Sequence, residues 1–180
     1  MPFRVIAGKY RHRNISFPLD SHIRPTKDRI REAIFSSLGD LSGLNVLDLY
    51  AGSGAMGIEA LSRNALFASF VDNNPLAINV IKENIKNLDI KEAEILFMND
   101  VDALNKFKNE SRHFDIVFID PPYQEGKYID VISTLINDGL VGEGSRIVTE
   151  CNYELDFSLI KYKKIKEHRY GEIIVNVLHL

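Results

Sequence analysis

Between residues 45 and 150, short apolar runs alternate with longer segments whose apolar residues recur every three or four positions. The short runs predict buried strands at 45–49, 66–71, 94–98, 115–119 and 145–149, and the longer segments predict helices near 55–63, 75–88, 101–108 and 127–138. This alternation is typical of a parallel sheet that is covered by helices on both faces. The sequence therefore predicts an α/β domain whose ligands bind beyond the carboxyl ends of the strands.

The segments on either side of this alternation are smaller. They predict a short hairpin, one helix and two final strands: residues 3–7 with 13–17, an apolar helix stripe from Ile30 to Leu38, and runs near 161–167 and 172–178. Lys27 and Arg31, which lie four positions apart, are expected to share a helix face in contact with water. We divide the chain into an N-terminal appendage, residues 1–43, and a main domain, residues 44–180.

The N-terminal arm is strongly basic although the whole chain carries a net charge of −3. Residues 1–31 contain eight basic and two acidic residues, a net charge of +6, and the remainder carries −9. A basic arm on an acidic body predicts a polyanionic partner such as nucleic acid, while a solvated basic face is the alternative interpretation. The candidate contacts in the arm are Arg4, Lys9, Arg11, Arg13, Arg24, Lys27 and Arg31.

A glycine-rich turn follows the first predicted strand of the alternation. Gly52, Gly54 and Gly57 match the pattern G-x-G-x-x-G, in which glycine permits a tight turn and a close approach of the ligand to the backbone. Asp72 follows Gly52 by 20 positions and ends the next predicted strand, where a carboxylate accepts hydrogen bonds from ribose hydroxyls. The glycine turn and Asp72 together predict a ligand that contains a nucleoside. The alternative is a tight turn that binds no ligand.

Two further carboxylates narrow the identity of that ligand. Asp48 lies four residues before Gly52, where it would repel a pyrophosphate but attract a ligand with a sulfonium and an ammonium group. Asp100 follows the third strand and can accept a hydrogen bond from an adenine amino group, or serve as a helix cap. Asp48 together with the glycines favours S-adenosylmethionine over NAD. The predicted cofactor site consists of Asp48, Tyr50, Gly52, Gly54, Asp72, Asn73, Asp100 and Val101.

The segment Asp120-Pro121-Pro122-Tyr123 follows the fourth predicted strand. The nitrogen of an aromatic amine is a poor nucleophile because its lone pair is delocalised, and acceptors on its two N–H bonds favour the pyramidal geometry that attack requires. The Asp120 carboxylate and the Pro121 carbonyl can be those acceptors; the prolines stiffen the loop, and Tyr123 offers a flat face for a base. The four residues predict methyl transfer to an exocyclic amino group of a base, against the alternative of a proline turn with an incidental tyrosine.

Other chemistries find little support in the sequence. Cys151, the only cysteine, has no identifiable base, and the five histidines lack the spacing of metal ligands. No apolar run is long enough to span a membrane, and the N-terminus is too short in apolar residues for a signal peptide. We expect a cytoplasmic, metal-free monomer.

The motifs together resemble the bacterial small-subunit ribosomal RNA guanine-N2 methyltransferases, a family within the Rossmann-like amino methyltransferases. The resemblance extends over the whole chain and depends on residues 4–8, 24–33, 48–54 and 59–63 besides Asp120–Tyr123. It implies a seven-stranded, mostly parallel sheet with an antiparallel last strand, preceded by a small basic element that contacts RNA. It also implies S-adenosylmethionine as methyl donor, S-adenosylhomocysteine as product, and a guanine in small-subunit ribosomal RNA, within a subunit or an assembly intermediate, as acceptor.

Carried over by position, the resemblance adds Thr26 beside Arg24, near the RNA or the methionine end of the cofactor. Two departures from the family pattern are mild: Asn64 replaces a glycine, and Asp72 replaces a longer glutamate. Three alternatives remain open at this point: an adenine-N6 methyltransferase, an NAD-dependent oxidoreductase or nucleotide-binding module, and a non-catalytic RNA-binding protein.

Overall fold

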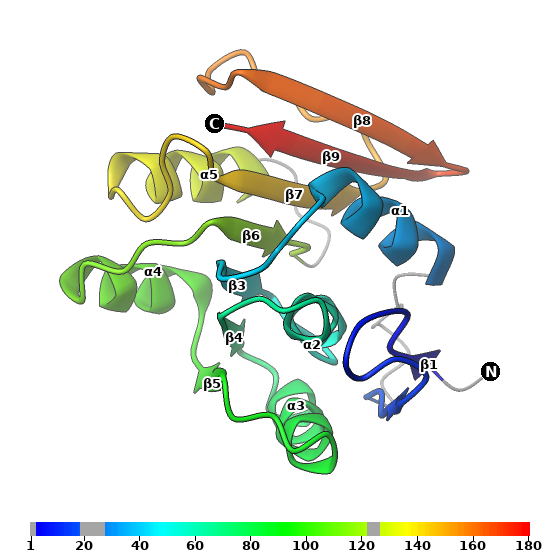
Figure 1. Ribbon diagram of the computed structural model, residues 1–180. Helices are drawn as coiled ribbons and strands as arrows, with labels where there is room; N and C mark the ends of the chain where they lie inside the picture. Colours follow the sequence, from blue (N-terminus) through cyan, green and yellow to red (C-terminus); the bar gives the residue numbers. More distant parts are fainter. Residues whose placement is uncertain (1–2, 19–27, 122–126) are drawn as a thin grey trace.

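The computed structural model describes residues 3–18, 28–121 and 127–180 (Figure 1). The elements in chain order are β1 (Phe3–Arg4), β2 (Asn14–Ile15), α1 (Asp28–Leu38), β3 (Asn45–Leu49), α2 (Ala55–Ser62), β4 (Phe67–Asp72), α3 (Pro75–Asn87), β5 (Ala93–Phe97), α4 (Asp100–Asn109), β6 (Ile116–Ile119), α5 (Lys127–Asn137), β7 (Arg146–Cys151), β8 (Lys164–Tyr170) and β9 (Ile173–His179). The predicted strands and helices of the alternation are confirmed, with ends that differ by one or two residues.

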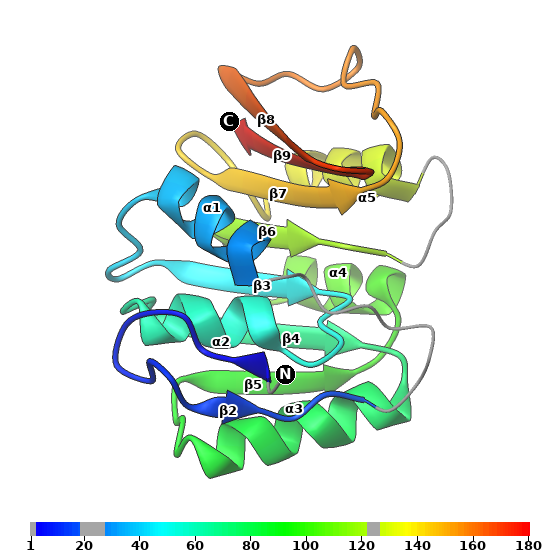
Figure 2. The same ribbon diagram turned by 90° about the vertical axis from the view of Figure 1, so that its right-hand side faces the viewer.

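The main sheet has seven strands in the order β5-β4-β3-β6-β7-β9-β8 (Figure 2). β3 pairs in parallel with both β4 and β6, and β9 is antiparallel to both of its neighbours. The predicted fold class, a Rossmann-like, mostly parallel sheet whose last strand is antiparallel, is confirmed.

Helices cover both faces of this sheet. α1, α2 and α3 lie on one face, and α4 and α5 lie on the other (Figure 1). Side chains of β3 alternate between the two layers, because Val46 packs with the core beneath α1–α3 whereas Leu47 and Leu49 pack with the core beneath α4 and α5. The same alternation turns Asp48 toward α2.

The N-terminal hairpin is shorter than predicted. The expected strands at 3–7 and 13–17 shrink to β1 and β2, which have two residues each. The reason is that the backbone amides of Ile6 and Ala7 donate to the carboxylate of Glu59 on α2, at 2.8 and 3.1 Å, instead of to a partner strand. The arm is therefore attached to α2 through a side chain as well as through its own hairpin.

Glu59 and Ser62 on α2 together hold the arm. Glu59 is fully buried and also accepts from Arg63 at 2.8 Å. The Ser62 hydroxyl donates to the Ala7 carbonyl at 2.5 Å and accepts from the Tyr10 amide at 3.0 Å, while the Ser62 carbonyl accepts from the Lys9 amide at 2.8 Å. These contacts give a structural role to two motifs on which the resemblance depended. After α2, Asn64 adopts a left-handed φ of 72°, as expected for the residue that replaces glycine.

Helix α1 packs on the sheet through Ile30, Ile34, Phe35 and Leu38, all buried in the core beneath α1–α3. Its carboxyl end has no basic residue of its own, and cations from the sheet bind there instead: Arg146 donates to the Leu38 carbonyl and Lys166 to the Ser37 carbonyl. The division of the chain at residue 43 stays a prediction.

The expectation that Arg31 faces water is wrong. Arg31 is fully buried, and its guanidinium donates to the Arg4 carbonyl at 2.6 Å and to the Asp28 carboxylate at 2.8 Å. Burial lowers the pKa of this guanidinium, and the charge of Glu59 acts in the opposite direction. Arg31 therefore fixes β1 to α1, and it has no accessible surface for contact with RNA.

Candidate functional site

Four carboxylates lie at the edge of the sheet formed by the carboxyl ends of the parallel strands. Asp48 lies in β3, Asp72 ends β4, Asp100 begins α4 after β5, and Asp120 follows β6. The chain runs from β3 outward to β4 and β5 and then returns to β6 on the other side of β3. This reversal of strand order is where open α/β sheets bind ligands.

Side chains of β3 and β4 hold the glycine turn in place. Asp72 accepts from the Gly52 amide at 2.8 Å and from the Asn74 amide at 2.8 Å, and Asp48 accepts from the Gly57 amide at 2.8 Å. Gly57 also packs so closely on β4 that an added Cβ would lie 2.3 Å from Cε1 of Phe70. The third glycine of the motif is thus required by packing between helix and strand, as in dinucleotide-binding turns.

Tyr50, Asp100 and Lys127 form a second group beside the turn. The Tyr50 hydroxyl donates to Asp100 at 2.8 Å, and the Lys127 ammonium lies 3.2 Å from the other carboxylate oxygen and 5.2 Å from the centre of the Tyr50 ring. Burial alone would raise the pKa of Asp100, but the bonds from Tyr50 and Lys127 outweigh burial and hold the pKa below its usual value. Tyr50 has a left-handed φ of 65°, a conformation that costs about 1–3 kcal/mol and is concentrated at functional sites.

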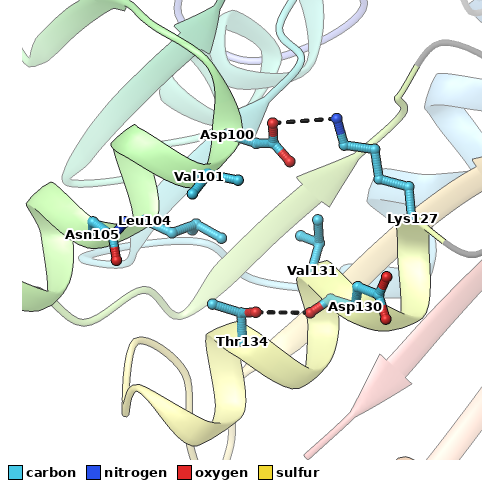
Figure 3. A pocket seen from close by; sticks show the side chains of 8 residues that line it. All are labelled: Asp100, Val101, Leu104, Asn105, Lys127, Asp130, Val131 and Thr134. Carbon is cyan, nitrogen blue, oxygen red and sulfur yellow. Dashed lines mark hydrogen bonds and ion pairs between the residues drawn. The ribbon is translucent and has the colours of Figure 1, made fainter.

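Asp100 and Lys127 also line a cavity of about 230 Å³ between α4 and α5 (Figure 3). Its lining combines acidic, basic and apolar side chains: Asp100, Val101, Leu104, Asn105, Lys127, Asp130, Val131 and Thr134. The volume is below the roughly 300–1,000 Å³ of whole small-molecule sites. The cavity can therefore take one part of a larger ligand, with the remainder along the strand ends.

Desolvation by the surrounding protein, and to a smaller extent repulsion between carboxylates, raises the pKa of two of these four acids. Burial, and to a smaller extent the charge of Asp72, raises the pKa of Asp48 to about 7 although Gly57 donates to it. The packing around Asp120, with the charges of Glu150 and Asp48, raises the pKa of Asp120 to about 8. Asp120 remains exposed to solvent, so it can exchange a proton with water. A cation bound at this edge would relieve the repulsion and favour the ionised forms.

Three residues of this edge were not predicted from the sequence: Glu150, Tyr128 and Lys127. Glu150, near the end of β7, adds a negative charge beside Asp120. The Tyr128 hydroxyl donates to the Glu150 carbonyl at 2.6 Å. Lys127 begins α5, the helix that follows the Asp120 segment. Glu150 could have been found by the rule that identified the other acids, because it too lies at the carboxyl end of a predicted strand. Nothing in the spacing of Lys127 pointed to Asp100.

The remaining predicted site residues have different surroundings. Pro121 is buried next to Asp120, whereas Pro122 and Tyr123 lie outside the described residues. Val101 and Asn73 are exposed at the strand-end edge. The cap of α4 is Asn99, whose side chain accepts from the Asp102 amide, so the alternative capping role for Asp100 does not apply.

Of the predicted RNA contacts, the structure describes Arg4, Lys9, Arg11 and Arg13 besides the buried Arg31. The Lys9 amide bonds to the last residue of α2, and the Arg13 guanidinium donates to the carbonyl of Asn87, the last residue of α3. Both helices run away from the strand-end edge, and α2 alone is about 12 Å long, so Lys9 and Arg13 lie near the opposite edge of the sheet. Arg11 lies between them in the hairpin turn. Arg4 is exposed, and its guanidinium lies 3.9 Å from the Asp28 carboxylate. Arg24, Thr26 and Lys27 lie outside the described residues.

The thiol of Cys151 is unsuited to nucleophilic catalysis. It is buried, it bonds to the Tyr153 carbonyl at 3.1 Å, and burial raises its pKa to about 11. Within residues 3–18, 28–121 and 127–180, no group of three His, Cys, Asp or Glu side chains could hold a metal ion. In the same ranges, no helix is long and apolar enough to cross a membrane.

The strand order, the antiparallel position of β9 in the main sheet and the glycine turn after β3 define a Rossmann-like fold of the S-adenosylmethionine-dependent methyltransferase class. Residues 3–179 match the family described as Conserved hypothetical protein 95, and the chain belongs to this family.

Known relatives agree with this assignment. The chain is 37% identical to Ribosomal RNA small subunit methyltransferase D of Buchnera aphidicola over 147 residues, 81% of this chain and 76% of the relative. It is 32% identical to the Escherichia coli protein of the same name over 152 residues, 84% of this chain and 75% of the relative. The solved structure of the hypothetical protein TTHA0928 of Thermus thermophilus superposes with a TM-score of 0.84 at 27% identity, covering 99% of each chain. The resemblance on which the sequence analysis relied is confirmed at the level of the family.

Proposed function

We propose that this chain transfers a methyl group from S-adenosylmethionine to the exocyclic N2 of a guanine in small-subunit ribosomal RNA. The observation that carries the proposal is the gathering of Asp48, Asp72, Asp100 and Asp120 at one edge, where desolvation by the surrounding protein and, to a smaller extent, negative charges nearby raise the pKa values of Asp48 and Asp120. A neutral or anionic ligand would leave that repulsion in place, whereas a sulfonium with an ammonium group would relieve it. The names of the relatives support ribosomal RNA as the class of acceptor.

The residues fit this cofactor through their chemistry. Asp72 at the end of β4 can accept from ribose hydroxyls, and Asp100 with the backbone of Val101 can bind the adenine edge beside the cavity between α4 and α5. Asp48 and the glycine turn would face the methionine part. When bound, S-adenosylmethionine supplies an electrophilic methyl group on a positively charged sulfur.

The base would be held by the residues after β6. The Asp120 carboxylate and the Pro121 carbonyl accept from the two N–H bonds of the amine, which makes its lone pair available for in-line attack on the methyl carbon. As the new C–N bond forms and the C–S bond breaks, S-adenosylhomocysteine leaves neutral and the nitrogen carries an extra proton. Asp120 is suited to accept this proton, because its pKa of about 8 makes it a stronger base than an ordinary aspartate.

The proposal is tested by supplying labelled S-adenosylmethionine and analysing the RNA nucleosides by mass spectrometry. Naked small-subunit RNA and assembled subunits, both lacking the modification, serve as parallel substrates and distinguish free RNA from a particle. Label in N2-methylguanosine supports the proposal. Label in N6-methyladenosine would identify the adenine methyltransferase instead, and binding of NAD without binding of S-adenosylmethionine would refute methyl transfer.

The raised pKa values predict that the protein discriminates between cofactor and product according to pH. From about pH 6 to about pH 8.5, affinity for S-adenosylmethionine relative to S-adenosylhomocysteine should rise about tenfold, because Asp48 and Asp120 ionise across this range and only the sulfonium gains from it. Both ligands carry the same amino-acid group, so the titration of that group cancels in the ratio of the two affinities. Calorimetry at several pH values measures this ratio.

The matched variants for this measurement are Asp48→Asn and Asp89→Asn. Asp48→Asn keeps an oxygen for the Gly57 amide but loses the charge, so the pH dependence should flatten. Asp89 is exposed on the surface, and its variant should behave like wild type. A ratio that is independent of pH in the wild type would show that these carboxylates do not face the sulfonium.

The basic arm predicts a separate, salt-sensitive contact with RNA. Arg11 is exposed near the edge opposite the site, and Arg11→Glu should weaken RNA binding several-fold and reduce its dependence on salt. Binding of S-adenosylhomocysteine should not change. Titration of labelled RNA at two salt concentrations measures the effect; equal RNA affinity in the variant would mean that the arm only packs against α2 and α3.

A further inference from the structure

Asn84 on α3 is a buried polar residue that has no direct part in the proposed methyl transfer. It is 2% exposed, and its side-chain amide makes three hydrogen bonds. Its Oδ1 accepts from the Ser16 amide at 2.7 Å, and its Nδ2 donates to the Ser16 carbonyl at 3.0 Å and to the Ser53 carbonyl at 3.0 Å. Because both carbonyls accept, the orientation of this amide is fixed by its partners.

The partners of Asn84 belong to two segments far apart in the sequence. Ser16 directly follows β2 and is part of the arm, and Asn84 pairs with its amide and carbonyl as a neighbouring strand would. Ser53 is buried inside the glycine turn, between Gly52 and Gly54. One side chain thus connects the arm to the turn that would bind the methyl donor.

The glycine turn depends on such contacts for its shape. Gly52 and Gly54 have φ values of 57° and 76°, so glycine freedom permits the turn but does not select it. Asp72 fixes the Gly52 amide and Asp48 fixes the Gly57 amide. Asn84 fixes the Ser53 carbonyl between them. Of these three side chains, it is the only one bonded to residues 3–18, the part of the arm before α1 that the structure describes.

We propose that Asn84 is a positioning residue that couples the N-terminal arm to the cofactor turn. Order in the arm fixes the amide of Asn84, which fixes the Ser53 carbonyl and so favours the turn conformation that binds the methyl donor. By reciprocity, occupation of the turn orders the arm around Ser16. The inference rests on the proposed function for the identity of the ligand, but the link between arm and turn does not depend on it.

The decisive variant is Asn84→Asp, which has the same shape but replaces the donating NH2 with an oxygen. That oxygen would face the carbonyls of Ser16 and Ser53, while the bond from the Ser16 amide could remain. The control is Asn79→Asp, the same change at an exposed position of the same helix. Calorimetry with S-adenosylhomocysteine should give an affinity about tenfold weaker for Asn84→Asp and unchanged for the control.

Hydrogen exchange separates positioning from general stability. In Asn84→Asp, exchange should accelerate at residues 52–54 and near Ser16, with the other protected amides as slow as in the control. In the wild type, S-adenosylhomocysteine should slow exchange near Ser16, and this protection should vanish in Asn84→Asp. An affinity and exchange pattern equal to the control, or exchange that is faster throughout the chain, would overturn the proposal.

A second variant decides the matter if Asn84→Asp does not fold. Ser16→Pro removes the amide that donates to Asn84 while leaving Asn84 itself and its bond to Ser53. Faster exchange at residues 52–54 caused by this change in the arm supports the coupling, and unchanged exchange there refutes it. Absence of S-adenosylhomocysteine binding by the wild type would instead count against the proposed function, and the exchange comparison would still test the link.

Discussion

Replacing Asp120 with alanine is expected to lower methyl transfer by about 10³-fold, the scale on which enzymes lose activity when one preorganised electrostatic partner of the reacting group is removed. The variant loses an acceptor for the amine and the base that takes up its proton. Binding of S-adenosylmethionine should change little, because Asp120, with a pKa of about 8, is largely neutral at pH 7 before the cofactor binds. Single-turnover transfer of labelled methyl groups, together with calorimetry, measures the two effects separately.

Asp120→Asn refines this experiment. It keeps one acceptor oxygen but cannot take up the proton, so its rate should lie between those of wild type and Asp120→Ala. The control, Asp89→Asn, removes one charge from the exposed surface and should be fully active. Normal turnover by Asp120→Ala would remove Asp120 from the mechanism, and an equal loss of cofactor affinity and rate would make it a binding residue.

Gly8→Ala is expected to cost about 3 kcal/mol of folding free energy, a large effect for one added methyl group. An added Cβ would lie 1.8 Å from the Ser62 carbonyl oxygen and 2.3 Å from its carbon, both backbone atoms that cannot rotate away. The arm would have to lift from α2, which would leave the buried carboxylate of Glu59 without the amides of Ile6 and Ala7. Urea unfolding measures the loss.

Gly39→Ala provides the matched control. Gly39 has a φ of 76°, close to the 82° of Gly8, but an added Cβ there has no neighbour within 4 Å. This variant therefore carries only the backbone strain, about 1 kcal/mol. The difference between the two variants isolates the contact between the arm and α2; equal destabilisation would show that this contact contributes nothing beyond strain.

Much of the candidate site could be predicted from the sequence because it depends on position along single strands. The carboxyl ends of parallel strands share one edge of the sheet. Asp72, Asp100 and Asp120 could therefore be predicted to lie near one another without any knowledge of their contacts. Asp72 and the glycines indicated a nucleoside ligand, and Asp48 together with the glycines indicated that this ligand is cationic. The guanine specificity rests on family resemblance, because nothing in these residues distinguishes one exocyclic amine from another.

Long-range partners could not be predicted in this way. Arg31 has the spacing of an exposed helix residue, yet it is buried because β1 places the Arg4 carbonyl against α1. The hairpin was expected to pair along its whole length, but Glu59 bonds to the amides of Ile6 and Ala7. In each case the partner group lies more than 20 positions away in the sequence, and local periodicity carries no information about such distances.

The sequence by itself determined the alternation of strands and helices, the glycine turn and the carboxylates at the strand ends, because these follow from local periodicity and from the shared direction of parallel strands. Only the tertiary structure decided that Lys127 pairs with Asp100 and that Asn84 joins the arm to the turn. These contacts depend on how separate elements pack across the sheet and between helices. That packing is set by the whole core and not by any one segment.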